Sequence, residues 1–137
     1  MVYDDATGEA GLQVAAVAGA TIAKGNVLSY IQGGTNLQVS PTPISGNEND
    51  MPMGVAYAAA TTGNPVWVWV SGICQVLPEG GVTATLGYIL YTSATTAGTV
   101  NQAATAPDTI THFKEVGHWA ETGSGAGALA RAVIHFN

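Results

Sequence analysis

Short runs in which hydrophobic and polar residues alternate, separated by glycine-rich turns, fill most of the chain. In residues 66–70, three valines alternate with Trp67 and Trp69, so a strand puts the valines on one face and the tryptophans on the other. Residues 37–39 alternate in the same way. A helix would scatter these side chains around its axis, so the pattern predicts β-strands.

Other segments with the composition of strands follow between turns. They are residues 27–31, 87–92, 116–119 and 130–136. Residues 40–52 hold three prolines among small polar residues and predict a loop. Two alanine-rich segments, 15–20 and 56–60, favour helix by propensity, but a glycine ends each one early. A short helix near Ala58 stays an alternative.

The two halves of the chain resemble each other at a shift of 62 or 63 residues. The run 25–28 aligns with 87–90, and the run 53–57 aligns with 116–120. Chance matches between glycine-rich strands are the alternative, but the matching blocks occur in the same order. We therefore predict two pseudo-repeats, residues 12–77 and 78–137.

These patterns together predict an all-β protein with one small domain that resembles a β-barrel or β-sandwich, residues 12–137. Closing such a sheet would hide its edges. Residues 1–11 mix acidic residues and glycines around Val2 and Tyr3, and are expected to form an extended N-terminal arm. The arm is a candidate to dock on a neighbouring subunit.

Charged residues are unusually rare. They make up 9% of the 137 residues, against about 25% in typical domains. Only Lys24, Lys114 and Arg131 are basic, and the formal net charge is −6. A coiled coil or helical bundle needs charged outer faces, and a nucleic-acid groove or a site for an anionic membrane needs many cations. We expect neither nucleic acid nor membrane as a partner.

The surface must instead consist of small polar and apolar residues, which are easily desolvated against another protein. The apolar stretch 12–23 is too short to span a bilayer, and the acidic start is opposite in sign to a secretory leader, so neither a membrane span nor a signal peptide is expected.

The single cysteine, Cys74, lies in the apolar run 73–76 and is predicted to be a small buried side chain, with a reactive thiol as the alternative.

Two motifs could suggest a ligand, but their spacing argues against it. His112, His118 and His135 could supply zinc ligands, yet their spacing is not that of a known zinc site. The run 123–127 has the glycines of a phosphate loop, but a strand pattern follows it, and phosphate loops need a helix there. We predict no metal, no other cofactor and a hairpin tip at 123–127.

Acidic residues are grouped at two places, Asp4, Asp5 and Glu9 in the arm, and Glu48 and Asp50 in the loop. Paired carboxylates could serve acid–base chemistry or calcium, but no calcium-loop series is present. A solvated acidic surface is the simpler interpretation. Because no nucleophile–base pair can be named, we predict that the protein is not an enzyme.

Three interpretations of Trp67, Trp69 and Trp119 stay open. Tryptophan is usually mostly buried, so core packing is one. Tryptophan is also enriched at protein interfaces, where it acts as an anchor. An aromatic platform that stacks on sugars is the third.

The order of turns and strands resembles the head decoration proteins of tailed phages, also called capsid cement proteins. The residues that carry the resemblance are Lys24-Gly25, Gly54-Val55-Ala56, Gly63, residues 66–70 and Gly72, and more loosely Gly87 and residues 117–120. The resemblance implies a β-rich protein without enzymatic activity that binds the outside of an expanded icosahedral head. Family members are trimers, dimers or monomers.

The resemblance leads to a first hypothesis, a virion structural protein that stabilises a phage head. Its partner would be the major capsid protein, its location the head exterior after synthesis in the host cytoplasm, and its state a homo-oligomer, with a trimer favoured over a dimer. The candidate contact residues are Val2, Tyr3, Asp4, Asp5, Trp67, Trp69 and Trp119. The alternative hypothesis is a carbohydrate- or receptor-binding module on a virion or cell surface.

Overall fold

Ten strands form a single sheet in the computed structural model, which describes residues 1–31, 33, 36–44, 51–105 and 114–136. The strands are β1 (Val2–Asp4), β2 (Glu9–Ala18), β3 (Val27–Tyr30), β4 (Gln38–Pro41), β5 (Gly54–Ala56), β6 (Pro65–Val76), β7 (Ile89–Thr92), β8 (Val100–Ala103), β9 (Glu115–Trp119) and β10 (Ala130–Ile134). The prediction of an all-β fold is confirmed. The described residues contain no α-helix, so the alternative of a helix near Ala58 is wrong.

The first half of the chain closes into a five-stranded ring. The strand order is β1-β2-β4-β3-β5-β6-β10-β9-β7-β8, and a further pairing of β2 with β6 joins the two ends of the segment β2-β4-β3-β5-β6. All five strands contribute to one buried cluster, which we call the first core. Its strand residues are Ala16, Ala18, Leu28, Val39, Ala56, Val66 and Val68. The valine face predicted for residues 66–70 therefore points into this ring.

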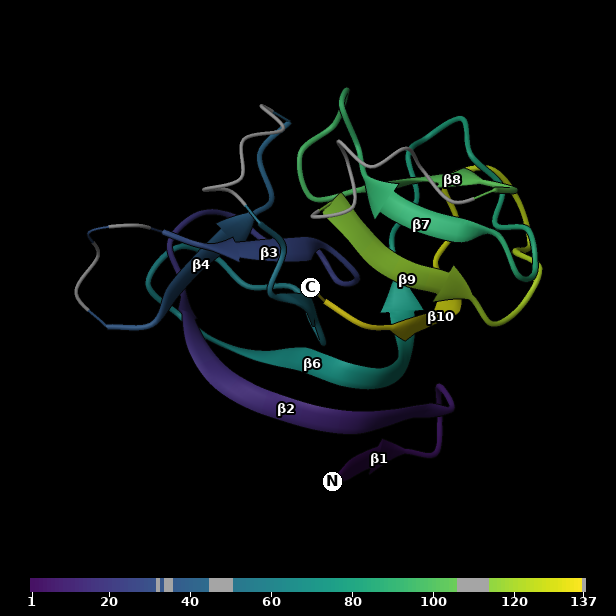
Figure 1. Cartoon of the computed structure of the whole chain (residues 1–137). Coiled ribbons are helices and arrows are strands. Elements are labelled where there is room, and N and C mark those ends of the chain that lie inside the picture. Colours follow the sequence, from purple (N-terminus) through teal and green to yellow (C-terminus); the bar gives the residue numbers. More distant parts are fainter. Residues whose placement is uncertain (32, 34–35, 45–50, 106–113, 137) are drawn as a thin grey trace.

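The second half continues the sheet from β6 through β10, β9 and β7 to β8 (Figure 1). The segment that follows β6 returns to β8 through a parallel bridge between Pro78 and Val100. There the Glu79 amide donates to the Val100 carbonyl at 2.9 Å. The second half thus curls into a looser ring, and the twelve-residue strand β6 is shared by both halves.

A second buried cluster, which we call the second core, includes Trp69 and Cys74 of β6. A β-bulge in β6 determines that both residues belong to it. Leu12 pairs with Ser71 and Gln13 with Trp69, so Val70 is an extra residue without a partner on β2. Strict alternation would put Trp69 and Cys74 on opposite faces, because they are five residues apart. The bulge brings both into the second core, where each is 0% exposed.

Each half contains a backbone hydrogen bond equivalent to one in the other half, at the shift of 62 or 63 residues seen in the sequence. Gly25 N donates to Ala56 O at 3.0 Å, and Gly87 N donates to Trp119 O at the same distance. Leu28 lies opposite Gly54 in the first half, and Leu90 lies opposite Gly117 in the second. Such a match is what an internal duplication would produce, and the boundaries 12–77 and 78–137 stay a prediction.

Residues 1–11 fold back onto the sheet. β1 pairs with residues 9–11 of β2, and the Gly8 amide closes the turn on the Asp4 carbonyl at 2.9 Å. Gly8 has a φ of 69°, which a residue with a side chain rarely adopts. The expected extended arm is therefore a β-hairpin, and the expected boundary after residue 11 falls inside β2.

Candidate protein-binding surface

Two of the seven candidate contact residues belong to the core. Trp69 and Trp119 are both 0% exposed, because the second half covers this face of β6. The Trp119 Nε1 group donates to Gln102 Oε1 at 2.7 Å, and Trp69 meets Tyr57 edge to face at 5.9 Å between ring centroids. The interface interpretation is corrected for these two residues, and the core interpretation holds.

Trp67 has a different environment although it lies on the same face of β6 as Trp69. It is 55% exposed and lies opposite the exposed Ala15 of β2, on the outer wall of the first ring. The second half does not reach this part of the strand. Trp67 is therefore accessible to a partner or to a sugar.

The hairpin presents the remaining candidates at the surface. Tyr3 is 67% exposed, Val2 is 40% exposed, and Asp5 is also exposed. Asp4 is half-buried, and its Oδ2 accepts a 2.6 Å hydrogen bond from the Tyr57 hydroxyl. That bond, the largest influence, holds the pKa of Asp4 below its usual value and raises the pKa of Tyr57. Asp4 thus fastens the hairpin, while Val2, Tyr3 and Asp5 point to solvent.

Glu9 is not part of a solvated acidic surface, contrary to the sequence-based interpretation. Its side chain is 0% exposed, with Oε1 3.0 Å from Lys24 Nζ and Oε2 accepting a hydrogen bond from the Gln75 amide at 3.2 Å. The same Lys24 Nζ donates to the Tyr57 carbonyl at 2.9 Å. This buried ion pair joins the hairpin to the first ring. The signal for it in the sequence was the rarity of cations, since an isolated lysine in an apolar stretch needs a carboxylate nearby.

A surface that the sequence did not reveal lies beside the hairpin. Tyr3 of β1 pairs with Ala10 of β2, which pairs with Ile73 of β6, which pairs with Val133 of β10. Paired residues lie on the same face of a sheet, and Leu12, two positions after Ala10, shares that face. We call these five residues the apolar row. They come from four strands far apart in the sequence, so no local pattern connects them.

Two of the three histidines lie near each other in the second half. His118 and His135 lie with ring centroids 6.4 Å apart, and His135 Nε2 is 3.6 Å from Glu115 Oε1. No group of three His, Cys, Asp or Glu in the described ranges could hold a metal. His112, Glu48 and Asp50 lie outside the described residues.

Two further sequence interpretations can be checked against the fold. Residues 123–127 lie in the turn between β9 and β10, and strand β10 rather than a helix follows them, as expected for a hairpin tip. Cys74 is fully buried, and burial raises the pKa of its thiol. The prediction of a buried side chain is confirmed, and the alternative of a reactive thiol is wrong. No helix in the part of the chain that the structure describes could cross a membrane.

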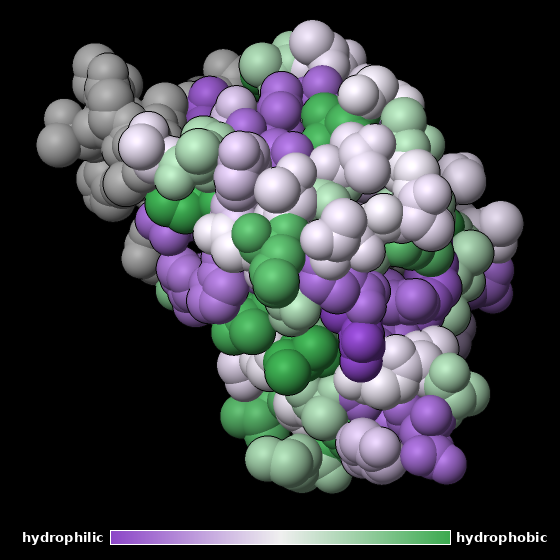
Figure 2. All heavy atoms as spheres, turned by 90° about the vertical axis from the view of Figure 1, so that its right-hand side faces the viewer, coloured by the Kyte–Doolittle hydropathy of each residue, from purple (hydrophilic) through white to green (hydrophobic). Residues whose placement is uncertain are grey.

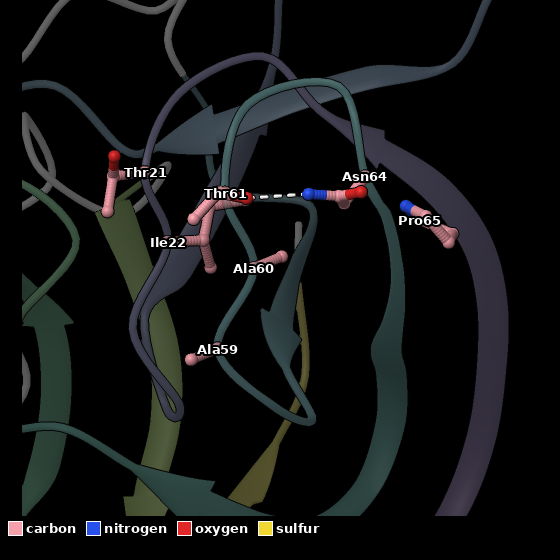
Figure 3. Close-up of a pocket in the computed structure, with 7 residues that line it drawn as sticks. All are labelled: Thr21, Ile22, Ala59, Ala60, Thr61, Asn64 and Pro65. Carbon is pink, nitrogen blue, oxygen red and sulfur yellow. Dashed lines mark hydrogen bonds between the residues drawn. The ribbon is translucent and has the colours of Figure 1, made fainter.

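A shallow pocket of about 410 Å³ opens at one end of the first ring (Figure 3). Its lining residues are Thr21, Ile22, Ala59, Ala60, Thr61, Asn64 and Pro65. Ile22 and Ala60, two of these residues, form an antiparallel bridge, and the Asn64 amide donates to the Thr61 hydroxyl. The lining offers hydroxyl, amide and methyl groups but no ionisable side chain, so it is suited to binding rather than to acid–base chemistry.

Two of the three basic side chains form ion pairs within the chain. The Arg131 guanidinium donates from Nη2 to Glu121 Oε2 at 2.8 Å, and the Arg131 backbone amide donates to Oε1 at 2.7 Å. The side-chain bond is the largest influence that holds the pKa of Glu121 below its usual value. Lys24 forms an ion pair with Glu9, and Lys114 is the third basic residue. Figure 2 shows the side of the second half, where pale residues of intermediate hydropathy separate small hydrophobic and hydrophilic groups.

Comparison with solved structures shows a fold similarity. No family model matches the chain, and no curated protein matches it. The crystal structure of the head fiber gp8.5 N base in bacteriophage phi29 is similar, with a TM-score of 0.62 and 20% sequence identity. The alignment covers 90% of this chain and 92% of that chain. The similarity therefore concerns the whole fold, both rings included, at an identity that shows the fold alone.

Proposed function

We propose that the protein is a non-enzymatic virion structural protein that binds the outer surface of a phage head and stabilises it. The observation that carries the proposal is the fold match over nearly the whole chain to the base of a phage head fiber. The sequence had led to the same class of protein through its resemblance to decoration proteins. The proposed partner is the major capsid protein, and the proposed location is the head exterior.

The surface chemistry supports this assignment. Two of the three basic side chains are paired with carboxylates of the same chain, and most exposed residues are small and uncharged. Such a surface is inexpensive to desolvate over a broad contact area. Many copies on one lattice, or several chains in one oligomer, would add weak contacts into strong attachment. We propose a homo-oligomer, with a trimer favoured over a dimer.

The direct test is binding to purified expanded heads that lack this protein. Cosedimentation should recover the protein with the heads, and bound heads should release their DNA at a higher temperature than bare heads. Bovine serum albumin, another acidic protein, serves as the control for non-specific binding. Failure to bind, or binding without any protection from heat, would reject the proposal.

A carbohydrate- or receptor-binding module is the second candidate, and the exposure of Trp67 favours it. Pro65 lies two residues before Trp67 on the same face of β6 and lines the uncharged pocket, so a sugar stacked on the indole could reach the hydroxyl and amide groups there. A glycan array should then give signals that disappear in Trp67→Ala. An array without signals would remove this candidate.

A further inference from the structure

The apolar row is an exposed hydrophobic surface on the outer face of the sheet. Tyr3, Leu12 and Ile73 are 67%, 52% and 37% exposed, whereas Ala10 and Val133 are half-buried. The residues that alternate with them on β6 and β10, Cys74 and Ala132, are both 0% exposed in the second core. The opposite face of these strands is thus fully packed, and the row faces outward.

The unpaired edge of β1 borders the row. β1 ends the strand order, and among the described residues it pairs with β2 alone. Exposed edge strands in natural proteins are usually protected by lysine, proline or a bulge, because free backbone groups can pair with another chain. The strand Val2–Asp4 is only three residues long, but it has no lysine, proline or bulge. Its edge therefore offers backbone hydrogen bonds beside an apolar surface.

Charge indicates the kind of chain that fits there. The Asp5 carboxylate lies beside the row, with Oδ1 accepting a 3.4 Å hydrogen bond from the Tyr3 hydroxyl. Lys24 and Arg131 are already paired within the chain, and Lys114 lies next to β9, beyond β2, β6 and β10 from this edge. A second copy would bring another net charge of −6, so a partner segment with basic residues is better matched.

We propose that the apolar row and the edge of β1 bind an extended segment of the major capsid protein, which pairs with β1, lays apolar side chains on the row and places a lysine or arginine near Asp5. This inference rests on the proposed function and names the contact surface for it. Main-chain pairing would supply affinity, and the row would supply specificity, as in other cases of strand addition.

The test compares exposed side chains inside and outside the row. Tyr3→Ser/Leu12→Ser should weaken binding to expanded heads about tenfold or more, since large side chains at a contact centre dominate affinity. The matched control is Tyr30→Ser/Leu86→Ser, whose parent residues are 50% and 62% exposed outside the row, and it should bind as the unmodified protein does. Thermal unfolding of both variants shows whether they remain folded.

Two measurements test the charge and the edge separately. Asp5→Lys should weaken binding more than Asp5→Asn, and raising NaCl from about 0.05 M to about 0.5 M should weaken the unmodified protein more than Asp5→Asn. Hydrogen exchange on bound heads should show new protection of the amides of β1, with residues 61–64 as a reference whose exchange should not change on binding.

The outcomes separate this inference from the proposed function. If the unmodified protein does not bind heads, the proposed function fails first. If it binds but Tyr3→Ser/Leu12→Ser binds equally well, or the β1 amides gain no protection, the contact surface is elsewhere and the inference is overturned. A change of mass by light scattering in that variant, with head binding unchanged, would show a contact between copies of this chain and would also overturn it.

Discussion

The two rings use the same backbone pattern but fill it differently. In the first core, a large side chain, Ile22, and a small one, Ala56, lie at two positions that the repeat makes comparable. In the second core, the position that corresponds to Ile22 holds the small Ala84, and the position that corresponds to Ala56 holds the large Trp119. β2 closes the first ring by pairing with β6 from Ala10 to Val17, whereas a single bridge returns the chain in the second. One strand arrangement thus tolerates two cores, provided that the volume inside is kept.

Removal of the large side chain from the second ring should have the largest effect. Trp119→Ala leaves a cavity and removes the hydrogen bond to Gln102 Oε1, and should lower the free energy of unfolding by about 3–5 kcal/mol. Chemical denaturation followed by intrinsic fluorescence gives the value. Trp67→Ala is the matched control on an exposed site, with an expected change within about 0.5 kcal/mol. A loss below about 1 kcal/mol for Trp119→Ala would contradict its place in the core.

The side-chain arrangement of the first core can be transferred to the second by two substitutions. Trp119→Ala/Ala84→Ile reproduces the residues at Ile22 and Ala56, and should recover part of the stability that Trp119→Ala loses. A double variant that is less stable than the single one would mean that the two cores are not interchangeable in volume.

Glycines at matching positions should respond in the same direction. A Cβ on Gly117 would lie 2.0 Å from the Val133 carbonyl oxygen, and one on Gly54 would lie 2.6 Å from that of Trp69. Gly117 also has a φ of 155°, so Gly117→Ala should cost about 3 kcal/mol and Gly54→Ala somewhat less. Gly81→Ala, where a Cβ meets open space, is the control. Equal stability of Gly117→Ala and Gly81→Ala would argue against the close strand contact.

The buried ion pair is particular to the first half. At the 62-residue shift, Leu86 stands where Lys24 stands, and Glu9 precedes the first pseudo-repeat. Lys24→Met should lower stability by about 2 kcal/mol, because it leaves the Glu9 carboxylate buried without its cation, although the lysine itself is partly exposed. Glu9→Gln/Lys24→Met should be more stable than Lys24→Met in urea unfolding. The opposite order would show that the pair is not coupled.

The smallest effect is a pH dependence from the hairpin. The pKa of Asp4 is lower in the folded protein than the usual value of about 3.9, so the unfolded chain binds its proton more tightly. The stabilisation is complete above that value and is lost as the pH falls through the lower, folded pKa. Melting temperatures below about pH 4 should therefore decrease less in Asp4→Asn than in the unmodified protein. Glu121, whose pKa is also lowered, contributes equally to both.

The sequence predicted what depends on alternation and turn chemistry. The valine face of residues 66–70 and the burial of Cys74 follow from local pattern and proved correct. A small barrel-like domain was also predicted, but its division into two rings was not, because alternation assigns a residue to a face but not to one of two cores. The bulge at Val70, which moves Trp69 and Cys74 to one side, has no signature in a single sequence.

The candidate contact surface was predictable only in part. The exposure of Val2, Tyr3 and Asp5 agrees with a terminal segment rich in polar residues. The tryptophans could not be sorted, since one strand carries Trp67 in solvent and Trp69 in the core, and only the position of the second half distinguishes them. The apolar row needed the register of four strands, which is tertiary information.

The most direct test of the account is cryo-electron microscopy of expanded heads that lack this protein, imaged before and after its addition. The account predicts added density on the outer surface, with the shape of the two joined rings and at positions repeated by the icosahedral symmetry. The hairpin and the apolar row should face the shell. An outer surface that is unchanged at saturating protein would contradict it.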